Sequence, residues 1–177
     1  LGALYEGKTP EEVAGYRIAD ICCGSGNFLL SAFEYVVNYH IEYLCQNSLE
    51  EALQSGKLYQ LPGTQNLFLS YEQKRKILEN LIYGVDIDPL AIEVTKFSLL
   101  LKVLEDSSAE ELDAYHARTH NRILPNLDEN IKLGNSLVDS NYAHYNRAVY
   151  QSLQLMNKLR MFDWNREFTE GKFDAII

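Results

Sequence analysis

The sequence is poor in cysteine and in basic residues, and it contains no long apolar run. Its three cysteines do not form a disulfide framework, and its apolar runs are far too short to span a membrane. No secretory signal opens the chain, so we expect a cytoplasmic protein that does not bind membranes. With 25 acidic and 16 basic residues the chain has no excess of positive charge. If the protein binds nucleic acid, most of the binding must depend on regions outside this chain.

Metal-binding patterns are also scarce. His116 and His120 have the i, i+4 spacing of a helix, but they lack the glutamate of a zinc-protease motif and a nearby third ligand. Cys22 and Cys23 are adjacent and would point to opposite faces of a strand, and we interpret them as buried thiols. The sequence therefore favours a protein without a metal site.

The length and the ends of the chain bear on its domain organisation. A chain of 177 residues is typical of one compact domain. It begins with leucine, and its last residues, Phe173 to Ile177, form an apolar run typical of a buried strand. Because an unpaired core strand is an aggregation hazard, we expect residues 1–177 to be a single, incomplete domain of a longer protein.

The most informative stretch runs from Tyr16 to Ala32. An apolar segment, Val13 to Cys23, meets a turn containing Gly24 and Gly26, and a helical pattern follows. That pattern comprises Phe28, Leu29, Ala32, Phe33, Val36, Val37, Ile41 and Leu44. The stretch therefore predicts a strand, a ligand-binding turn and a helix.

The residues of this turn limit the kind of ligand. Glycines let the backbone reverse and approach a ligand closely, and the free amides at the helix start attract an anionic group. Asp20, before the turn, suits a positive amine or donor hydroxyls and would repel a pyrophosphate. Leu29 stands where the dinucleotide fingerprint has its third glycine. A zwitterionic amino-acid tail fits better than a pyrophosphate, and an NAD-dependent dehydrogenase is the alternative.

A second strand and turn follow a polar insertion at Gln46 to Ser70. The run from Leu81 to Val85 predicts a strand that ends at Asp86, where nucleotide-binding α/β domains hold the ribose hydroxyls. Asp88 can cap a helix that starts at Pro89. We expect the apolar face of that helix to comprise Leu90, Val94, Phe97, Leu101 and Leu104.

The rest of the chain predicts shorter elements. Serines followed three residues later by Glu or Gln predict helix caps at Ser48, Ser70 and Ser108. A second polar insertion, 105–130, precedes a third strand, Ile131 to Leu133, and a turn with Gly134, Asn135 and Ser136. We also expect a helix over Tyr142 to Leu159.

These motifs, in this order, resemble those of bacterial DNA adenine-N6 methyltransferases. The likeness spans nearly the whole chain and rests on five segments: DICCGSGNFLLSA, IYGVDIDPLAIEVTKFSLLL, NIKLGNSL, FDWNREF and KFDAII. It is greatest to the fused polypeptides of type IIG and type I restriction-modification systems. The resemblance implies S-adenosylmethionine as cofactor and a partial doubly wound, Rossmann-like α/β domain with parallel strands in the order 3-2-1-4.

The resemblance also implies the roles of individual residues. It places the methionine part of the cofactor against Asp20, Cys22, Gly24, Ser25 and Gly26, with Asn27 and Phe28 at the helix start. It places the ribose hydroxyls on Asp86, the adenine ring against Ile87 and the adenine amino group near Asn135 or Ser136. The chain departs from the usual Pro-Ala at Ile21 and Cys22, and it has Asn135 where aspartate is common.

The resemblance places catalysis beyond Ile177. In the family, the strand that corresponds to FDAII is followed by Asn-Pro-Pro-Tyr or Phe, which binds the target amine and stacks the flipped base. We therefore expect no catalytic residue within 1–177, and no activity from this chain alone. Double-stranded DNA would bind through regions outside it, with a restriction or specificity domain as a partner. Alternatives are an RNA or protein methyltransferase and a noncatalytic module for assembly or cofactor sensing.

Overall fold

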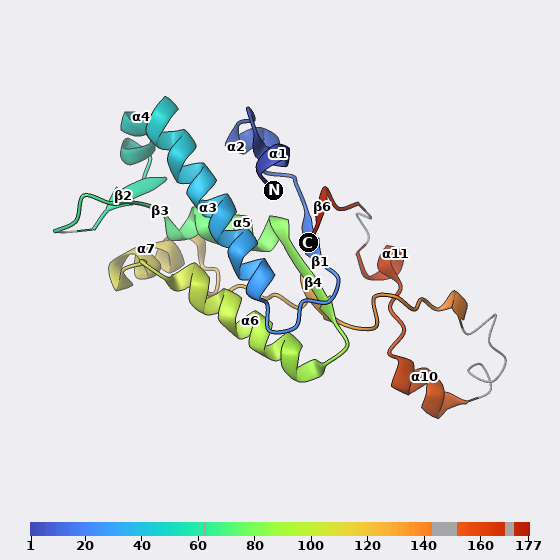
Figure 1. Ribbon diagram of the computed structural model, residues 1–177. Coiled ribbons are helices and arrows are strands. Elements are labelled where there is room, and N and C mark those ends of the chain that lie inside the picture. Colours follow the sequence, from blue (N-terminus) through green and yellow to red (C-terminus); the bar gives the residue numbers. More distant parts are fainter. Residues whose placement is uncertain (62, 143–151, 169–171) are drawn as a thin grey trace.

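The main feature of the fold is a parallel sheet of four short strands (Figure 1). The computed structural model describes residues 1–61, 63–142, 152–168 and 172–177. The sheet comprises β1 (Ile18–Asp20), β4 (Ile82–Asp86), β5 (Ile131–Leu133) and β6 (Ala175–Ile176). Its order is β5-β4-β1-β6, and every neighbouring pair is parallel. Counted along the chain, β1, β4, β5 and β6 are the first, second, third and fourth strands of this sheet. The expected order 3-2-1-4 is therefore confirmed, as is the α/β class.

Helices lie on both sides of this sheet, with most of them on one side. The helices are α1 (Gly2–Tyr5), α2 (Pro10–Val13), α3 (Asn27–Asn47), α4 (Leu49–Gln54), α5 (Tyr71–Leu81), α6 (Pro89–Leu104), α7 (Ala109–Thr119), α10 (Leu153–Leu159) and α11 (Trp164–Glu167). In Figure 1, α3, α5, α6 and α7 lie on one side of β1 and β4, and α10 and α11 lie on the other. No helix among the described residues is long and apolar enough to cross a membrane.

Several expected elements differ in extent. Val13 ends α2 instead of starting a strand, and β1 is only three residues long. The insertion at 46–70 contains α4 and also an antiparallel hairpin of β2 (Leu58–Gln60) and β3 (Leu67–Leu69), which was not predicted. Of the helix expected over Tyr142 to Leu159, the structure describes α10, whereas residues 143–151 lie outside the described part.

The predicted serine caps are only partly confirmed. Ser108 caps α7, because its hydroxyl accepts a hydrogen bond from the Glu111 amide at 3.1 Å. Ser48 and Ser70 are the N-cap residues of α4 and α5, as predicted, but neither side chain makes the expected cap bond. At the start of α5, the Tyr71 amide donates instead to the Glu111 carboxylate at 2.6 Å. A distant side chain thus satisfies one of the free amides in the first turn of α5.

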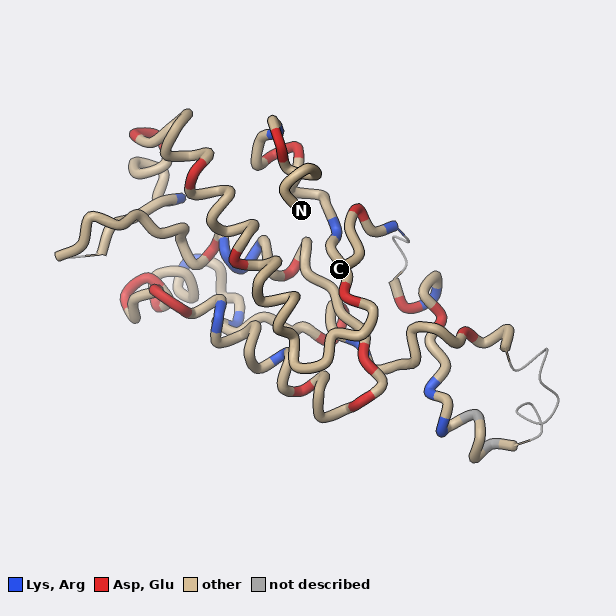
Figure 2. Tube along the Cα trace, viewed as in Figure 1, with Lys and Arg blue, Asp and Glu red and all other residues tan. Residues whose placement is uncertain are grey.

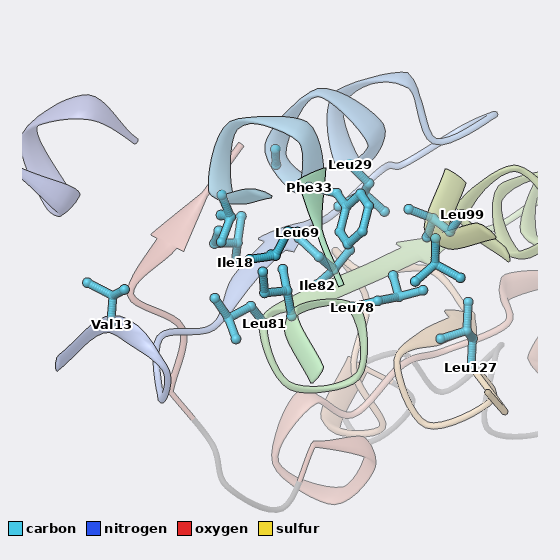
Figure 3. Packing of buried hydrophobic residues seen from close by; sticks show 14 of the residues in the cluster. Val13, Ile18, Leu29, Phe33, Leu69, Leu78, Leu81, Ile82, Leu99 and Leu127 are labelled. Atoms are coloured by element: carbon cyan, nitrogen blue, oxygen red, sulfur yellow. The ribbon is translucent and has the colours of Figure 1, made fainter. Parts of the chain in front are cut away.

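Strand β4 divides the interior into two clusters, because alternate side chains of a strand point to opposite faces. Ile82 belongs to the large aliphatic cluster under α3, in which Leu29, Phe33 and Leu99 are also buried (Figure 3). Tyr83 and Val85 instead join a smaller cluster on the other face, with Phe162, Phe168, Trp164 and Phe173. The two faces of the sheet are thus covered by different kinds of side chain, mainly aliphatic on one face and mainly aromatic on the other.

A buried arginine lies within the smaller, aromatic cluster. The Arg17 guanidinium carbon is 4.3 Å from the centre of the Tyr83 ring and 4.7 Å from that of Phe173. Its Nε and Nη1 atoms have no hydrogen-bond partner among the described residues. Cation–π contacts therefore take the place of hydrogen bonds there. The Arg17 amide also donates to the Asp174 carboxylate at 2.9 Å, which ties β6 to β1.

Helix α6 buries a different face from the one predicted. The expected apolar stripe is largely exposed: Leu90 74%, Val94 48%, Phe97 63% and Leu101 53%. The buried residues are Ile92, Thr95, Leu99 and Val103, which lie on the opposite side of the helix. The helix is apolar on both sides, so periodicity alone could not identify the inner face.

The last strand is also more exposed than expected. β6 pairs with β1 through Ile18 and Ala19, but Ile176 is 65% exposed. In the described part of the chain β6 has β1 as its only neighbour in the sheet, so no strand pairs with its outer edge there.

Candidate cofactor-binding site

The glycine turn after β1 has the backbone shape that requires glycine. Gly24 has φ 52° and Gly26 has φ 84°, both in the left-handed region. The Gly26 amide donates to the Cys23 carbonyl at 2.8 Å, which closes the turn. Gly26 is also the N-cap of α3 and offers no side-chain acceptor, so the amides of Asn27 and Phe28 begin the helix without a side-chain cap. Such amides suit an anionic ligand group.

Asp86 at the end of β4 holds this turn directly. Its Oδ2 accepts a hydrogen bond from the Gly24 amide at 2.8 Å, and its Oδ1 accepts one from the Asp88 amide at 2.8 Å. Asp88 in turn caps α6 by accepting from the Leu90 amide at 2.9 Å, as predicted. The two motifs that lie 62 residues apart in sequence therefore meet at one carboxylate.

Asp20 is the second carboxylate at this edge of the sheet. It is 2% exposed, and its Oδ1 accepts from the Cys22 amide at 3.0 Å. Burial raises the pKa of Asp20, the hydrogen bond from Cys22 opposes this shift, and the negative charge of Asp86 adds to it. A cationic ligand group beside Asp20 would offset both the loss of solvation of the ionised carboxylate and its repulsion by Asp86.

The third turn is joined to the same place. The Gly134 amide donates to the Asp86 carbonyl at 2.8 Å, so the turn after β5 begins beside Asp86. The Asn135 side-chain oxygen accepts from the Leu137 amide at 3.2 Å, and the Ser136 carbonyl accepts from the Trp164 indole at 2.9 Å. The amide oxygen expected to receive the adenine amine therefore already has one donor.

Large apolar side chains are exposed directly after each of the three turns. Phe28 is 70% exposed, Ile87 48% and Leu137 83%. Exposed apolar residues beside polar turns are typical of a ligand or partner site. Leu137 was not predicted, because a single leucine after Gly134 to Ser136 gives no pattern in the sequence.

The two adjacent cysteines differ in exposure, so the prediction of two buried thiols is half right. Cys23 is buried, and burial, with the charges of Asp86 and Asp20, raises the pKa of its thiol to about 12. Cys22 is exposed on the turn, as Ser25 is. The Cys23 thiol therefore stays protonated at neutral pH and does not serve as a nucleophile.

Two contributions to the site were missed by the sequence analysis. The Thr95 hydroxyl on α6 donates to the Gly24 carbonyl at 2.8 Å, and nothing in the sequence marks this residue. Leu29, in place of the third glycine, is fully buried against Gly84 of β4, where an added Cβ would lie 2.8 Å from Leu29 Cδ1. The close approach of helix and strand is thus provided by a glycine on the neighbouring strand.

A cavity of about 330 Å³ lies away from these turns, between α3, β3, α5 and the end of α6. Its wall includes the buried Lys74, whose ammonium donates to the Ser107 hydroxyl at 3.1 Å and to the Glu105 carbonyl. Burial lowers the pKa of Lys74. These bonds tie α5 to the turn after α6, so we assign Lys74 a structural role.

The arrangement defines a class of protein. A parallel α/β sheet with a glycine turn at β1, an acidic turn at β4 and a polar turn at β5 is that of a partial Rossmann-like methyltransferase domain. The chain belongs to the Eco57I restriction-modification methylase family, whose model matches residues 80–177, more than half of the chain.

Two relatives support this membership. The type II restriction enzyme and methyltransferase RM.Eco57I of Escherichia coli is 39% identical over 135 residues, which cover 76% of this chain and 12% of the relative. A putative type II restriction enzyme and methyltransferase of Methanocaldococcus jannaschii is 32% identical over 130 residues, covering 72% of this chain and 9% of that relative. The chain thus spans about a tenth of these relatives.

Proposed function

We propose that this chain is the S-adenosylmethionine-binding part of a restriction-modification methyltransferase that methylates adenine N6 in DNA. The observation that carries the proposal is the hydrogen bond between the Gly24 amide and the Asp86 carboxylate. It brings an uncapped helix start and two carboxylates to one edge of the sheet. S-adenosylmethionine carries the matching groups, namely a carboxylate, an ammonium and a ribose diol.

Each part of the cofactor has a chemical counterpart in the chain. The free amides at Asn27 and Phe28 suit its carboxylate, and the buried Asp20 suits its ammonium group. Asp86 suits the ribose hydroxyls, and the half-exposed Ile87 suits the adenine ring. Cys22, Ser25 and Asn27 are exposed on the turn, and Asn135 or Ser136 would lie near the adenine amine. The bound cofactor would supply the transferable methyl group.

The DNA substrate is supported by the names of the relatives, whereas the charge of the chain bears on which part of the protein would bind the DNA. Both relatives are named as combined restriction enzymes and methyltransferases. Figure 2 shows Asp and Glu spread along the described trace, while Lys and Arg do not gather into one continuous stretch. With a net charge of −9, these residues would hold the methyl donor while other regions of the protein grip the DNA.

Calorimetric titration of S-adenosylmethionine tests the cofactor site. Asp86→Ala removes the proposed acceptor of the ribose hydroxyls, so we expect affinity to fall roughly tenfold or more. Gly26→Val should abolish binding, because an added Cβ would lie 2.8 Å from Thr95 Cγ2 and the left-handed φ of 84° disfavours valine.

A matched control separates this role from charge alone. Asp88→Asn removes the same charge two residues away, but asparagine still caps α6, so affinity should stay near that of the wild type. Unchanged affinity in both Asp86→Ala and Gly26→Val would refute the site. Tighter binding of NAD than of S-adenosylmethionine would favour the dehydrogenase alternative. Mass spectrometry of DNA treated with the complete protein and cofactor tests for N6-methyladenine.

A further inference from the structure

Thr95 is a buried polar residue whose single hydroxyl contacts the proposed site. It lies in the middle of the inner face of α6 and is 0% exposed. A buried hydroxyl must find a hydrogen-bond partner, and within a helix it commonly bonds to a carbonyl of its own helix. Thr95 instead donates across to the Gly24 carbonyl at 2.8 Å. The hydroxyl thus bonds to the glycine turn instead of to its own helix.

The rest of the Thr95 side chain lies beneath the second glycine of the turn. A Cβ built on Gly26 would lie 2.8 Å from Thr95 Cγ2 and 3.0 Å from its Oγ1. The Thr95 methyl group therefore fills the space directly under Gly26. One side chain bonds to the first glycine of the turn and packs against the second.

Thr95 and Asp86 together fix the orientation of Gly24. Asp86 accepts a hydrogen bond from the Gly24 amide, and Thr95 donates one to the Gly24 carbonyl. Both residues come from the β4–α6 segment, whereas Gly24 follows β1. Gly24 has few conformational restraints of its own, so these two bonds hold it at φ 52°.

We propose that Thr95 is a positioning residue for the cofactor site. Its hydroxyl holds the Gly24–Gly26 turn in the shape that presents the amides of α3 to the methionine end of S-adenosylmethionine. This role rests on the proposed function for its ligand, whereas the effect on the turn itself does not depend on any ligand. Replacing the hydroxyl with a methyl group should loosen the turn without emptying the space under Gly26.

The test compares Thr95→Val, Thr95→Ser and the wild type by calorimetry and by hydrogen exchange of the peptide that covers residues 22–28. Valine keeps the shape and loses the hydrogen bond, so we expect faster exchange without ligand and roughly two- to tenfold weaker cofactor binding. Serine keeps the hydroxyl and should restore both properties to near the wild-type values. Thr119→Val is the matched control, because it removes a hydroxyl-to-carbonyl bond in α7 and should change neither.

The outcomes distinguish the two proposals. Wild-type exchange and affinity in Thr95→Val would make Thr95 a packing residue only and overturn the inference. A serine variant that resembles the valine variant would overturn it too, because the methyl group would then be the important part. If the wild type binds no S-adenosylmethionine, the proposed function fails while the exchange comparison still decides the effect on the turn. If Thr95→Val does not fold, the same comparison is made between Thr95→Ser and Thr95→Ala.

Discussion

The two faces of the main sheet differ in what covers them and in what their residues contact. The face under α3 and α6 is packed mainly with aliphatic side chains. The same helices are joined to the glycine turn, because Gly26 of the turn is the N-cap of α3 and Thr95 of α6 donates to the Gly24 carbonyl. The other face is covered by aromatic rings around Arg17. The first face therefore supports the glycine turn, whereas the second contacts the proposed site at the turn after β5, where the Trp164 indole donates to the Ser136 carbonyl.

The largest expected effect is on the aromatic face. Phe168 is 3% exposed, and its ring centre lies 5.4 to 5.8 Å from those of Tyr83, Phe162, Trp164 and Phe173. Phe168→Ala should lower the free energy of unfolding by about 3–5 kcal/mol, measured by urea denaturation. Cofactor affinity of the folded fraction should change by less than about threefold. A larger loss of cofactor affinity would mean that the aromatic face also shapes the cofactor site, which would contradict the distinction between the two faces.

A second prediction concerns the inner and outer sides of α6. Leu99 is 0% exposed, so Leu99→Ala should lower the free energy of unfolding by about 2–5 kcal/mol. Phe97 is 63% exposed on the opposite side, and Phe97→Ala should change the free energy of unfolding by less than about 0.5 kcal/mol. Both values come from the same denaturation experiment. Equal losses in the two variants would contradict the assignment of the inner face.

The smallest effect is expected at Asp20 and depends on pH. Because burial raises the pKa of Asp20 in the folded state, its contribution to stability is greatest below the ordinary pKa and is lost as pH rises through the raised value. Asp20→Asn cannot ionise but can still accept from the Cys22 amide. The variant should therefore gain stability relative to the wild type as pH increases from 4 to 7. A difference that is constant over this range would refute the raised pKa.

Binding should show the opposite sign at the same residue. An ammonium group beside Asp20 favours the ionised carboxylate, so wild-type affinity for S-adenosylmethionine should fall as the pH is lowered and Asp20 becomes protonated. Asp20→Asn should bind more weakly than the wild type at pH 7 and lose this part of the pH dependence. Calorimetry at several pH values measures both effects.

Much of the fold was predictable because its signals are local. The Gly24–Gly26 turn, the strand ending at Asp86 and the cap at Asp88 all depend on residue types with specific backbone preferences. The order of the main sheet followed from the resemblance of the motifs to a known family, and the structure confirms it.

What the sequence could not predict depends on contacts between distant residues. The inner face of α6 was misassigned because the helix has apolar residues on two opposite sides, and the buried side contains the polar Thr95. At the start of α5, the acceptor for the Tyr71 amide is Glu111, which lies 40 residues further along the chain. The pairing of Leu29 with Gly84 likewise joins two segments that no local pattern relates.

The hydrogen bonds at Asp86 also have a consequence for ligand selectivity. A carboxylate has about four acceptor positions, and the amides of Gly24 and Asp88 each occupy one, on different oxygens. Each oxygen therefore keeps one position for a ligand, which matches the two neighbouring hydroxyls of a ribose. A deoxyribose would leave one position unused. In the proposed site, Asp86 would therefore favour a ribose over a deoxyribose, because only the ribose can donate to both remaining positions.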